Sequence, residues 1–117
     1  MIINIISSSR YKLERKKIKK NIEEIIIKKS GILFSFVNLI FVGKRKIKTL
    51  ALKYKNENTA LPVLTFYYHE QDTGEIFICY PQMIILAAEK NKTVNYILSF
   101  LLEHAIDNLI KQKSSNN

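Results

Sequence analysis

Apolar residues recur along the chain with two different spacings, and each spacing predicts a different kind of element. Apolar residues that recur every three or four positions predict helices over residues 11–29, 44–54, 81–90 and 94–111. Short runs rich in β-branched and aromatic residues predict strands over residues 2–6, 32–42, 63–69 and 75–80. The order β-α-β-α-β-β-α-α predicts an α+β domain, in which helices pack against a four-stranded mixed β-sheet.

Turn and capping residues support several of these boundaries. Gly31 follows the first helix and can take the left-handed conformation that ends many helices. Thr93 is a good N-cap for the last helix, and Pro81 suits the first position of the helix before it. Residues 70–74 form a turn, so we expect the strands on either side of it to pair antiparallel.

Length and composition point to one domain. The chain has 117 residues, of which 47% are hydrophobic, so it can bury a substantial core. We expect a single domain over 1–113 and a frayed tail over 114–117. The only cysteine, Cys79, rules out an internal disulfide and lies in an apolar strand, where a core role is expected. Because no targeting segment is visible, we expect a cytoplasmic protein that does not enter a membrane.

Positive charge is concentrated in the N-terminal half. Residues 1–55 hold 15 Lys and Arg against 3 Asp and Glu, a net charge of +12, whereas residues 56–117 have a net charge of −3. This asymmetry favours a polyanionic partner, with RNA the first candidate and DNA not expected. The candidate RNA-binding residues are Lys44, Arg45, Lys46, Lys48 and Lys53. Codon bias in an AT-rich genome would also produce an excess of lysine.

Candidate metal ligands are few. His104, Asp107 and Asn108 lie at i, i+3 and i+4 of the last predicted helix, so they share a face. Helices that bind catalytic zinc usually supply two histidines at i and i+4. The pair of His104 and Asp107 is therefore only a weak signal for a metal site. The aromatic residues lie in strands, where core packing is the default; an exposed base-stacking surface at Tyr67 and Tyr68 is the alternative.

Four segments, in the right order, resemble the YbeY family of bacterial rRNA-maturation endoribonucleases. Residues 36–42 resemble the family's V-x-I-x-F-V strand, and residues 50–66 match L-N-x-x-Y-R-G-x-x-x-P-T-D-V-L-S-F without a gap. Residues 74–79 resemble G-D-I-x-I-S, and residues 100–114 resemble F-L-L-x-H-G-x-L-H-L-x-G-Y-D-H. The resemblance implies the family fold, an rRNA or ribosomal-particle partner and a monomer.

The resemblance also implies a zinc site that this chain has largely lost. The family's three histidines, spaced H-x3-H-x5-H, correspond here to His104, Asn108 and Ser114. The family's loop arginine corresponds to Lys55, which keeps the charge for a phosphate contact but not the planar fork. Losing two imidazoles would cost roughly 6–8 kcal/mol of zinc binding, so we expect weak or absent zinc. Asp107 or His69 could substitute as a ligand only in a rearranged site.

Three functions follow from these observations. The first is a YbeY-like protein that binds rRNA or ribosomal particles and whose endoribonuclease activity is lost or impaired. The second is an active metal-dependent endoribonuclease that cleaves single-stranded RNA in rRNA processing, with a metal activating water. The third is a protein-interaction module without a role in RNA, which an exposed apolar patch near the last helix would favour.

Overall fold

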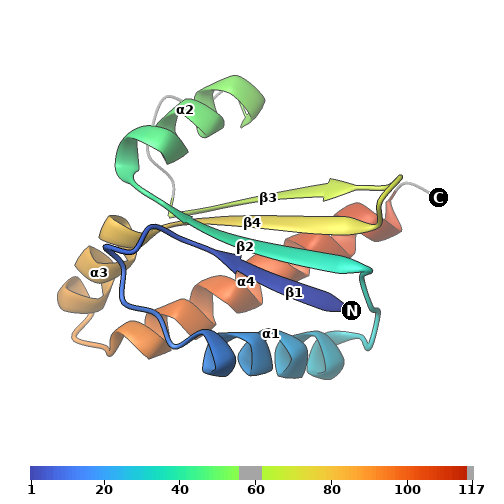
Figure 1. The fold of residues 1–117 in the computed structure, drawn as a ribbon, viewed down its shortest axis with the longest axis horizontal. Helices are drawn as coiled ribbons and strands as arrows, with labels where there is room; N and C mark the ends of the chain where they lie inside the picture. Colours follow the sequence, from blue (N-terminus) through green and yellow to red (C-terminus); the bar gives the residue numbers. More distant parts are fainter. Residues whose placement is uncertain (56–61, 116–117) are drawn as a thin grey trace.

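The computed structural model describes residues 1–55 and 62–115 and confirms the predicted order of elements and the α+β class (Figure 1). The predicted loop at 56–61 and the last two residues of the predicted tail lie outside the described residues. The elements are β1 (Ile2–Ile6), α1 (Arg15–Lys29), β2 (Phe36–Val42), α2 (Lys44–Lys55), β3 (Val63–Tyr68), β4 (Thr73–Cys79), α3 (Tyr80–Glu89) and α4 (Val94–Ser114).

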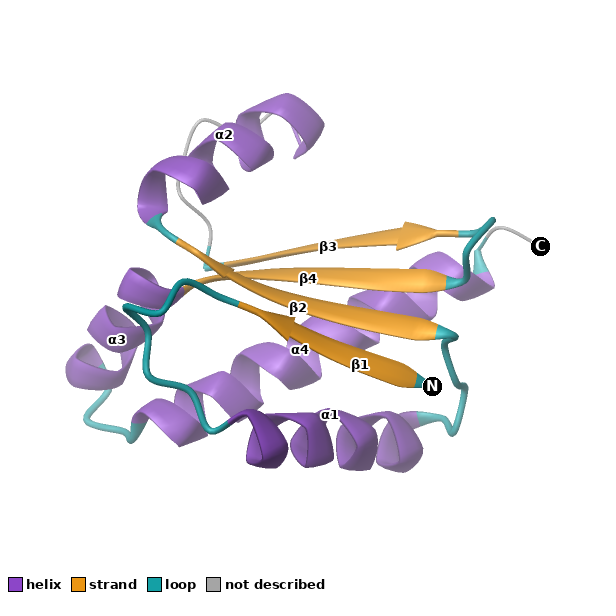
Figure 2. Cartoon of the chain, viewed as in Figure 1, coloured by secondary structure: helices purple, strands orange, loops and turns teal. Residues whose placement is uncertain are grey.

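The four strands form one mixed sheet in the order β1-β2-β4-β3 (Figure 2). Strands β1, β2 and β4 run parallel, whereas β3 pairs antiparallel with β4, as the turn between them predicts. Side chains alternate between the two faces, so Thr65 lies opposite Ile76 on one face and Phe66 lies opposite Glu75 on the other. This alternation decides which residues of β3 can meet each helix.

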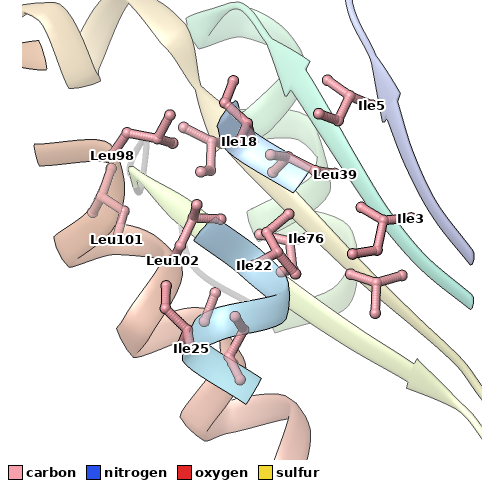
Figure 3. Packing of buried hydrophobic residues seen from close by; sticks show 14 of the residues in the cluster. Ile3, Ile5, Ile18, Ile22, Ile25, Leu39, Ile76, Leu98, Leu101 and Leu102 are labelled. Atoms are coloured by element: carbon pink, nitrogen blue, oxygen red, sulfur yellow. The ribbon is translucent and has the colours of Figure 1, made fainter. Parts of the chain in front are cut away.

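The main hydrophobic core fills the space between the sheet and the helices α1 and α4 (Figure 3). Ile22 of α1, Leu39 and Ile76 of the sheet and Leu102 of α4 are fully buried there. Helix α2 lies on the opposite face of the sheet and forms a smaller cluster (Figure 1). That cluster includes Cys79, which confirms its predicted role as a core residue.

Two elements start later than the pattern predicts, because tertiary contacts hold the residues before them in other conformations. The first helix begins at Arg15 rather than at residue 11, and the Tyr11 ring stacks on Tyr80 with 4.2 Å between centroids. Strand β2 begins at Phe36 rather than at residue 32. Its predicted first residues instead form a loop in which the Ser35 backbone N–H donates to the Asp72 carboxylate at 2.9 Å.

Helix α4 ends at Ser114, three residues beyond the end predicted from its apolar stripe. Residue 114 therefore belongs to the helix rather than to a tail. Helix α4 begins at Val94, as predicted, and the side chain of its N-cap Thr93 accepts a hydrogen bond from the Tyr96 backbone N–H at 3.0 Å. The predicted left-handed residue after α1 is also confirmed, with Gly31 at φ +69°. No helix within residues 1–55 and 62–115 is long and apolar enough to cross a membrane.

At the start of β4 and of α3 the structure shifts the predicted boundary. Strand β4 begins at Thr73, inside the predicted turn, because Asp72 adopts φ +48° and completes the reversal early. Helix α3 begins at Tyr80, so Pro81 lies in the first turn, where its missing N–H costs nothing. The earlier start of β4 follows from its pairing with β3, which continues to Tyr68 and Thr73 at the hairpin.

Candidate functional site

His104 and Asn108 lie one turn apart on the same side of α4. Together with Gln112 they are spaced four residues apart, so they form one stripe along the helix. Gln112 Nε2 donates to Thr65 Oγ1 of β3 at 3.0 Å, which places the C-terminal end of the stripe beside that strand. His104 is exposed and Asn108 is half-buried. The structure therefore brings together the first two of the three family ligand positions.

Ser114, at the third position, does not converge on the same point. It is the last residue of a continuous helix that also contains His104. Ten residues of α-helix separate them by about 15 Å along the axis and by about 80° around it. Zinc holds its ligand atoms at about 2 Å, so the short Ser114 side chain cannot share an ion with His104.

Asp107 does not replace the missing ligands, because it points to α1. Its Oδ1 accepts from Lys29 Nζ at 3.0 Å. Within the described parts of the chain, no group of three or more His, Cys, Asp or Glu could hold a metal ion. His104 and Asn108 offer one imidazole and one amide, a donor set too weak for zinc. The residues present do not fit the family's metal site.

This misfit gives a measurable expectation for zinc binding. Asn108→His should raise the affinity for Zn²⁺ by roughly 100-fold, because one further imidazole at i+4 contributes about 3 kcal/mol. Competition with a chromogenic zinc chelator measures both proteins. The same substitution in a His104→Ala background is the control and should give no gain. Tight stoichiometric zinc binding by the unaltered chain would contradict this reading of α4.

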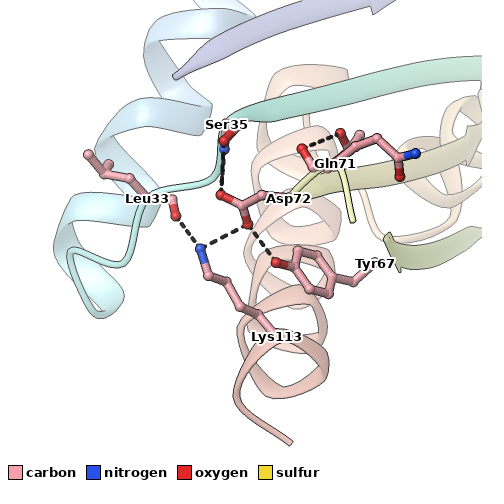
Figure 4. A network of polar contacts seen from close by, with 7 residues as sticks. Leu33, Ser35, Tyr67, Gln71, Asp72 and Lys113 are labelled. Carbon is pink, nitrogen blue, oxygen red and sulfur yellow. Dashed lines mark hydrogen bonds and ion pairs between the residues drawn. The ribbon is translucent and has the colours of Figure 1, made fainter. Parts of the chain in front are cut away.

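The end of α4 is held by a polar network that sequence reasoning missed, here called the Asp72 clamp (Figure 4). Asp72 lies in the β3–β4 turn, and its Oδ1 accepts from Lys113 Nζ at 3.0 Å and from the Tyr67 hydroxyl at 2.5 Å. Its Oδ2 accepts from the Ser35 backbone N–H at 2.9 Å. Lys113 also donates to the Leu33 carbonyl at 2.6 Å. The clamp thus ties α4 to the β3–β4 turn and to the loop before β2.

The electrostatics of the Asp72 clamp keep the carboxylate ionised. Burial would raise the pKa of Asp72, but hydrogen bonds from Tyr67, Lys113 and Ser35 outweigh it and lower the pKa to about 2. Burial and the neighbouring Asp72 raise the pKa of the Tyr67 hydroxyl to about 12, so it remains a donor. The sequence hints at this cluster through an Asp in a predicted tight turn, because Asp tolerates the positive φ that Asp72 adopts there.

The predicted RNA-binding residues all lie on α2, on the other face of the sheet. The helix carries no acidic residue, and its exposed basic side chains are those of Lys44, Arg45, Lys46, Lys48, Lys53 and Lys55. Lys55 Nζ lies 5.1 Å from the centre of the Phe66 ring, on the sheet face opposite Thr65 and α4. The structure therefore groups Lys55 with the other basic residues of α2 and separates it from His104.

The second basic helix, α1, lies on the far side of the sheet from α2 (Figure 1). Part of its charge is already neutralised within the protein. Lys17 Nζ pairs with Glu14 at 2.8 Å, and Lys29 pairs with Asp107 at 3.0 Å. Among the described residues, no ion pair involves α2. The sheet thus divides the basic N-terminal half into two surfaces, of which only the one on α1 contains ion pairs among the residues that the structure describes.

Comparison with known proteins assigns the chain to a family. The sequence profile of the Endoribonuclease YbeY family matches residues 4–109. A protein named Endoribonuclease YbeY from Thermodesulfovibrio yellowstonii is 32% identical over 97 residues, covering 78% of this chain and 60% of that protein. One of the same name from Dehalococcoides mccartyi strain CBDB1 is 28% identical over 131 aligned residues, covering 94% and 79%.

A solved structure shows the same fold. The solution structure of a Thermotoga maritima protein superposes with a TM-score of 0.63 and 28% sequence identity, covering 90% of this chain and 69% of that one. The agreement in fold thus covers about as much of the chain as the match to the sequence profile does. With the profile covering 106 of its residues, from 4 to 109, the chain belongs to the Endoribonuclease YbeY family.

Proposed function

We propose that this chain binds ribosomal RNA through α2 and takes part in rRNA maturation, with the endoribonuclease activity of its relatives lost or impaired. The observation that carries the proposal is the surface of α2, whose exposed basic side chains form no ion pair with any residue in 1–55 or 62–115. A phosphate backbone would supply the missing negative charge. The family membership supports RNA as the source of that charge, since the relatives are named as endoribonucleases.

Reversing charge on α2 tests the proposal. The triple variant K44E/R45E/K48E should bind an rRNA fragment much more weakly than the unaltered chain. In a plot of log affinity against log salt, the slope should become shallower by about 2, since three contacts to single-stranded phosphate are removed. Fluorescence anisotropy with a labelled fragment, at several salt concentrations, measures both quantities.

Helix α1 provides a matched control. The variant K16E/K19E/K20E changes the net charge by the same amount, and these three side chains are also exposed. It should keep most of the affinity and the original salt slope, because α1 lies across the sheet from α2. Equal loss in both variants would show that RNA responds to overall charge and not to α2.

Cleavage distinguishes the proposal from an active nuclease. Single-stranded RNA incubated with the protein and a divalent metal should remain intact at the level of a buffer blank, since α4 supplies no convergent ligand set. Cleavage that disappears in His104→Ala would instead establish a reduced metal site on α4. Cleavage that persists in His104→Ala would point to a contaminating nuclease and leave RNA binding unaffected.

An exposed apolar patch favours a protein partner as the second candidate. A hollow of about 180 Å³ between α3 and α4 is lined by Leu86, Lys90, Lys92, Tyr96, Ile97 and Phe100, and Phe100 is 58% exposed. Because two lysines flank the apolar floor, the fitting partner is an amphipathic helix with acidic residues at its edges. Absence of RNA binding at low salt, together with binding of such a peptide that Phe100→Ser abolishes, would favour this function.

A further inference from the structure

A second hollow lies on the α2 side of the sheet, beside the proposed RNA surface. Its volume is about 150 Å³, and its lining comes from α2 and from the paired strands β3 and β4: Leu50, Tyr54, Phe66, Tyr68, Glu75 and Phe77. Most of these side chains are apolar, yet the space they line is open to solvent. A hollow of this kind is suited to a flat, mainly apolar group that carries a few polar atoms.

The walls of the hollow are aromatic. Tyr54 and Tyr68 are 56% and 44% exposed, so each leaves ring surface available. Phe66 packs edge-to-face against Tyr54, at 5.4 Å between centroids, and against Phe77, at 5.9 Å. These contacts hold the rings in place, which lowers the entropy lost when another ring stacks on them.

Cations lie immediately beside the rings. Lys53 Nζ is 5.1 Å from the centre of the Tyr54 ring, and Lys55 Nζ is 5.1 Å from that of Phe66. Open aromatic rings that alternate with basic side chains are typical of proteins that bind single-stranded nucleic acid, in which bases stack and phosphates pair with lysine. The hollow therefore suits one unpaired base, with the lysines of α2 placed for its phosphates.

Among the described residues that line the hollow, Glu75 is the acidic one, and its carboxylate indicates which base fits. Its Oε1 accepts a hydrogen bond from the Tyr68 hydroxyl at 3.0 Å, which orients the carboxylate within the hollow. A carboxylate repels phosphate, so it can favour RNA by accepting hydrogen bonds from a base or from a ribose 2′-hydroxyl, and of these only the contact with a base distinguishes sequences. The Watson–Crick edge of guanine offers two adjacent N–H donors to a carboxylate, and no other standard base offers such a pair.

We propose that this hollow is a nucleobase pocket that takes one unpaired guanine of a single-stranded RNA. The base stacks between Tyr54 and Tyr68 and donates to Glu75, while Lys53 and Lys55 contact the adjoining phosphates. The pocket rests on the proposed function, because it specifies what the α2 surface reads along the RNA. It adds base preference to a surface whose lysines alone cannot distinguish sequences.

The test compares labelled ten-nucleotide RNAs that contain only uridine with ones that carry a single central guanosine, adenosine or cytidine. Fluorescence anisotropy at low salt should show the guanosine RNA bound tightest. Tyr68→Ala should weaken its binding roughly 10-fold, the loss typical of one stacked base. Glu75→Gln should make the four affinities equal without weakening the uridine RNA, since the lysines remain.

Two variants keep the test independent of folding. Tyr68→Phe retains the ring and should retain most of the affinity, so a loss confined to Tyr68→Ala identifies stacking. Tyr96 is the matched control, because it is 54% exposed and has Lys92 Nζ 4.9 Å from its ring centre, but it lies on α4. Tyr96→Ala should bind all four RNAs as the unaltered chain does.

Failure of the pocket and failure of the proposed function give different results. Equal binding of all four RNAs, unchanged in Tyr68→Ala, would overturn the nucleobase pocket and leave RNA binding by α2 standing. No binding of any RNA at low salt would overturn the proposed function and the pocket with it. A preference for guanosine that Glu75→Gln leaves unchanged would overturn the role of Glu75.

Discussion

Gly74→Val should lower the free energy of unfolding by roughly 3 kcal/mol, the upper part of the range for overpacking a core. Gly74 lies on the face of β4 that meets α4, and a Cβ atom there would be 2.8 Å from Leu109 Cδ1 and 3.2 Å from Cδ2. Leu109 is fully buried, so its side chain has little room to move away. The glycine thus allows α4 to lie close against the sheet.

A double-mutant cycle isolates this contact. Leu109→Ala alone should also destabilise the protein by about 3 kcal/mol, because it leaves a cavity. With both substitutions, the added valine fills part of that cavity, so the combined loss should fall short of the sum by about 1 kcal/mol or more. Urea denaturation of the four proteins measures the coupling, and strict additivity would show that Gly74 is required for a reason other than Leu109.

Asp72→Asn should lower the free energy of unfolding at pH 7 by about 2 kcal/mol. The estimate follows from the pKa of Asp72, which falls from an ordinary 3.8 to about 2 in the folded protein. The substitution keeps the shape of the side chain but removes the charge that Lys113 contacts at 3.0 Å. It also leaves the Tyr67 hydroxyl with a weaker acceptor.

The sign of this pKa shift sets the pH dependence. A carboxylate with a lowered folded-state pKa adds stability above its unfolded pKa, and that contribution disappears as the pH falls through the folded pKa. The contribution of Asp72 should therefore be complete above about pH 4 and lost progressively toward about pH 2. In Asp72→Asn this part of the acid-induced loss should be missing.

Urea denaturation of both proteins between pH 7 and pH 2 measures the two effects together. Glu70→Gln provides the control, because it removes one exposed carboxylate from the same turn. Its stability should follow that of the unaltered chain within a few tenths of a kcal/mol. A constant difference between Asp72→Asn and the unaltered chain at every pH would show that the charge of Asp72 does not stabilise the fold.

Most of the fold was predictable from the sequence, because the two hydrophobic spacings are local properties. Burial of Ile22 on a helix and of Leu39 on a strand follows from period 3.6 in one segment and period 2 in another. The wrong predictions concern the ends of elements, where contacts with residues distant in the chain hold the backbone in another conformation. Tyr11 stacks on Tyr80 and Ser35 donates to Asp72, and no local pattern contains either pair.

The candidate site was predictable only in part. The sequence identifies the basic residues of α2 and the substitutions at Asn108 and Ser114. It does not reveal that α4 continues through Ser114, which is what prevents that position from approaching His104. The sequence singles out Tyr68 as a possible stacking residue, but it does not reveal the hollow beside Glu75, because three separate elements contribute its walls.

The order of elements, the family resemblance and the loss of two of the three family histidines follow from residue types and their spacing, so they could be predicted without coordinates. The fold was needed to show that the two basic helices lie on opposite faces of the sheet and that Lys55 is separated from His104. The face on which a helix packs depends on contacts between residues that are distant in the chain, so no local pattern reveals it. Alternation along β3, for example, directs Thr65 toward α4 and Phe66 toward α2.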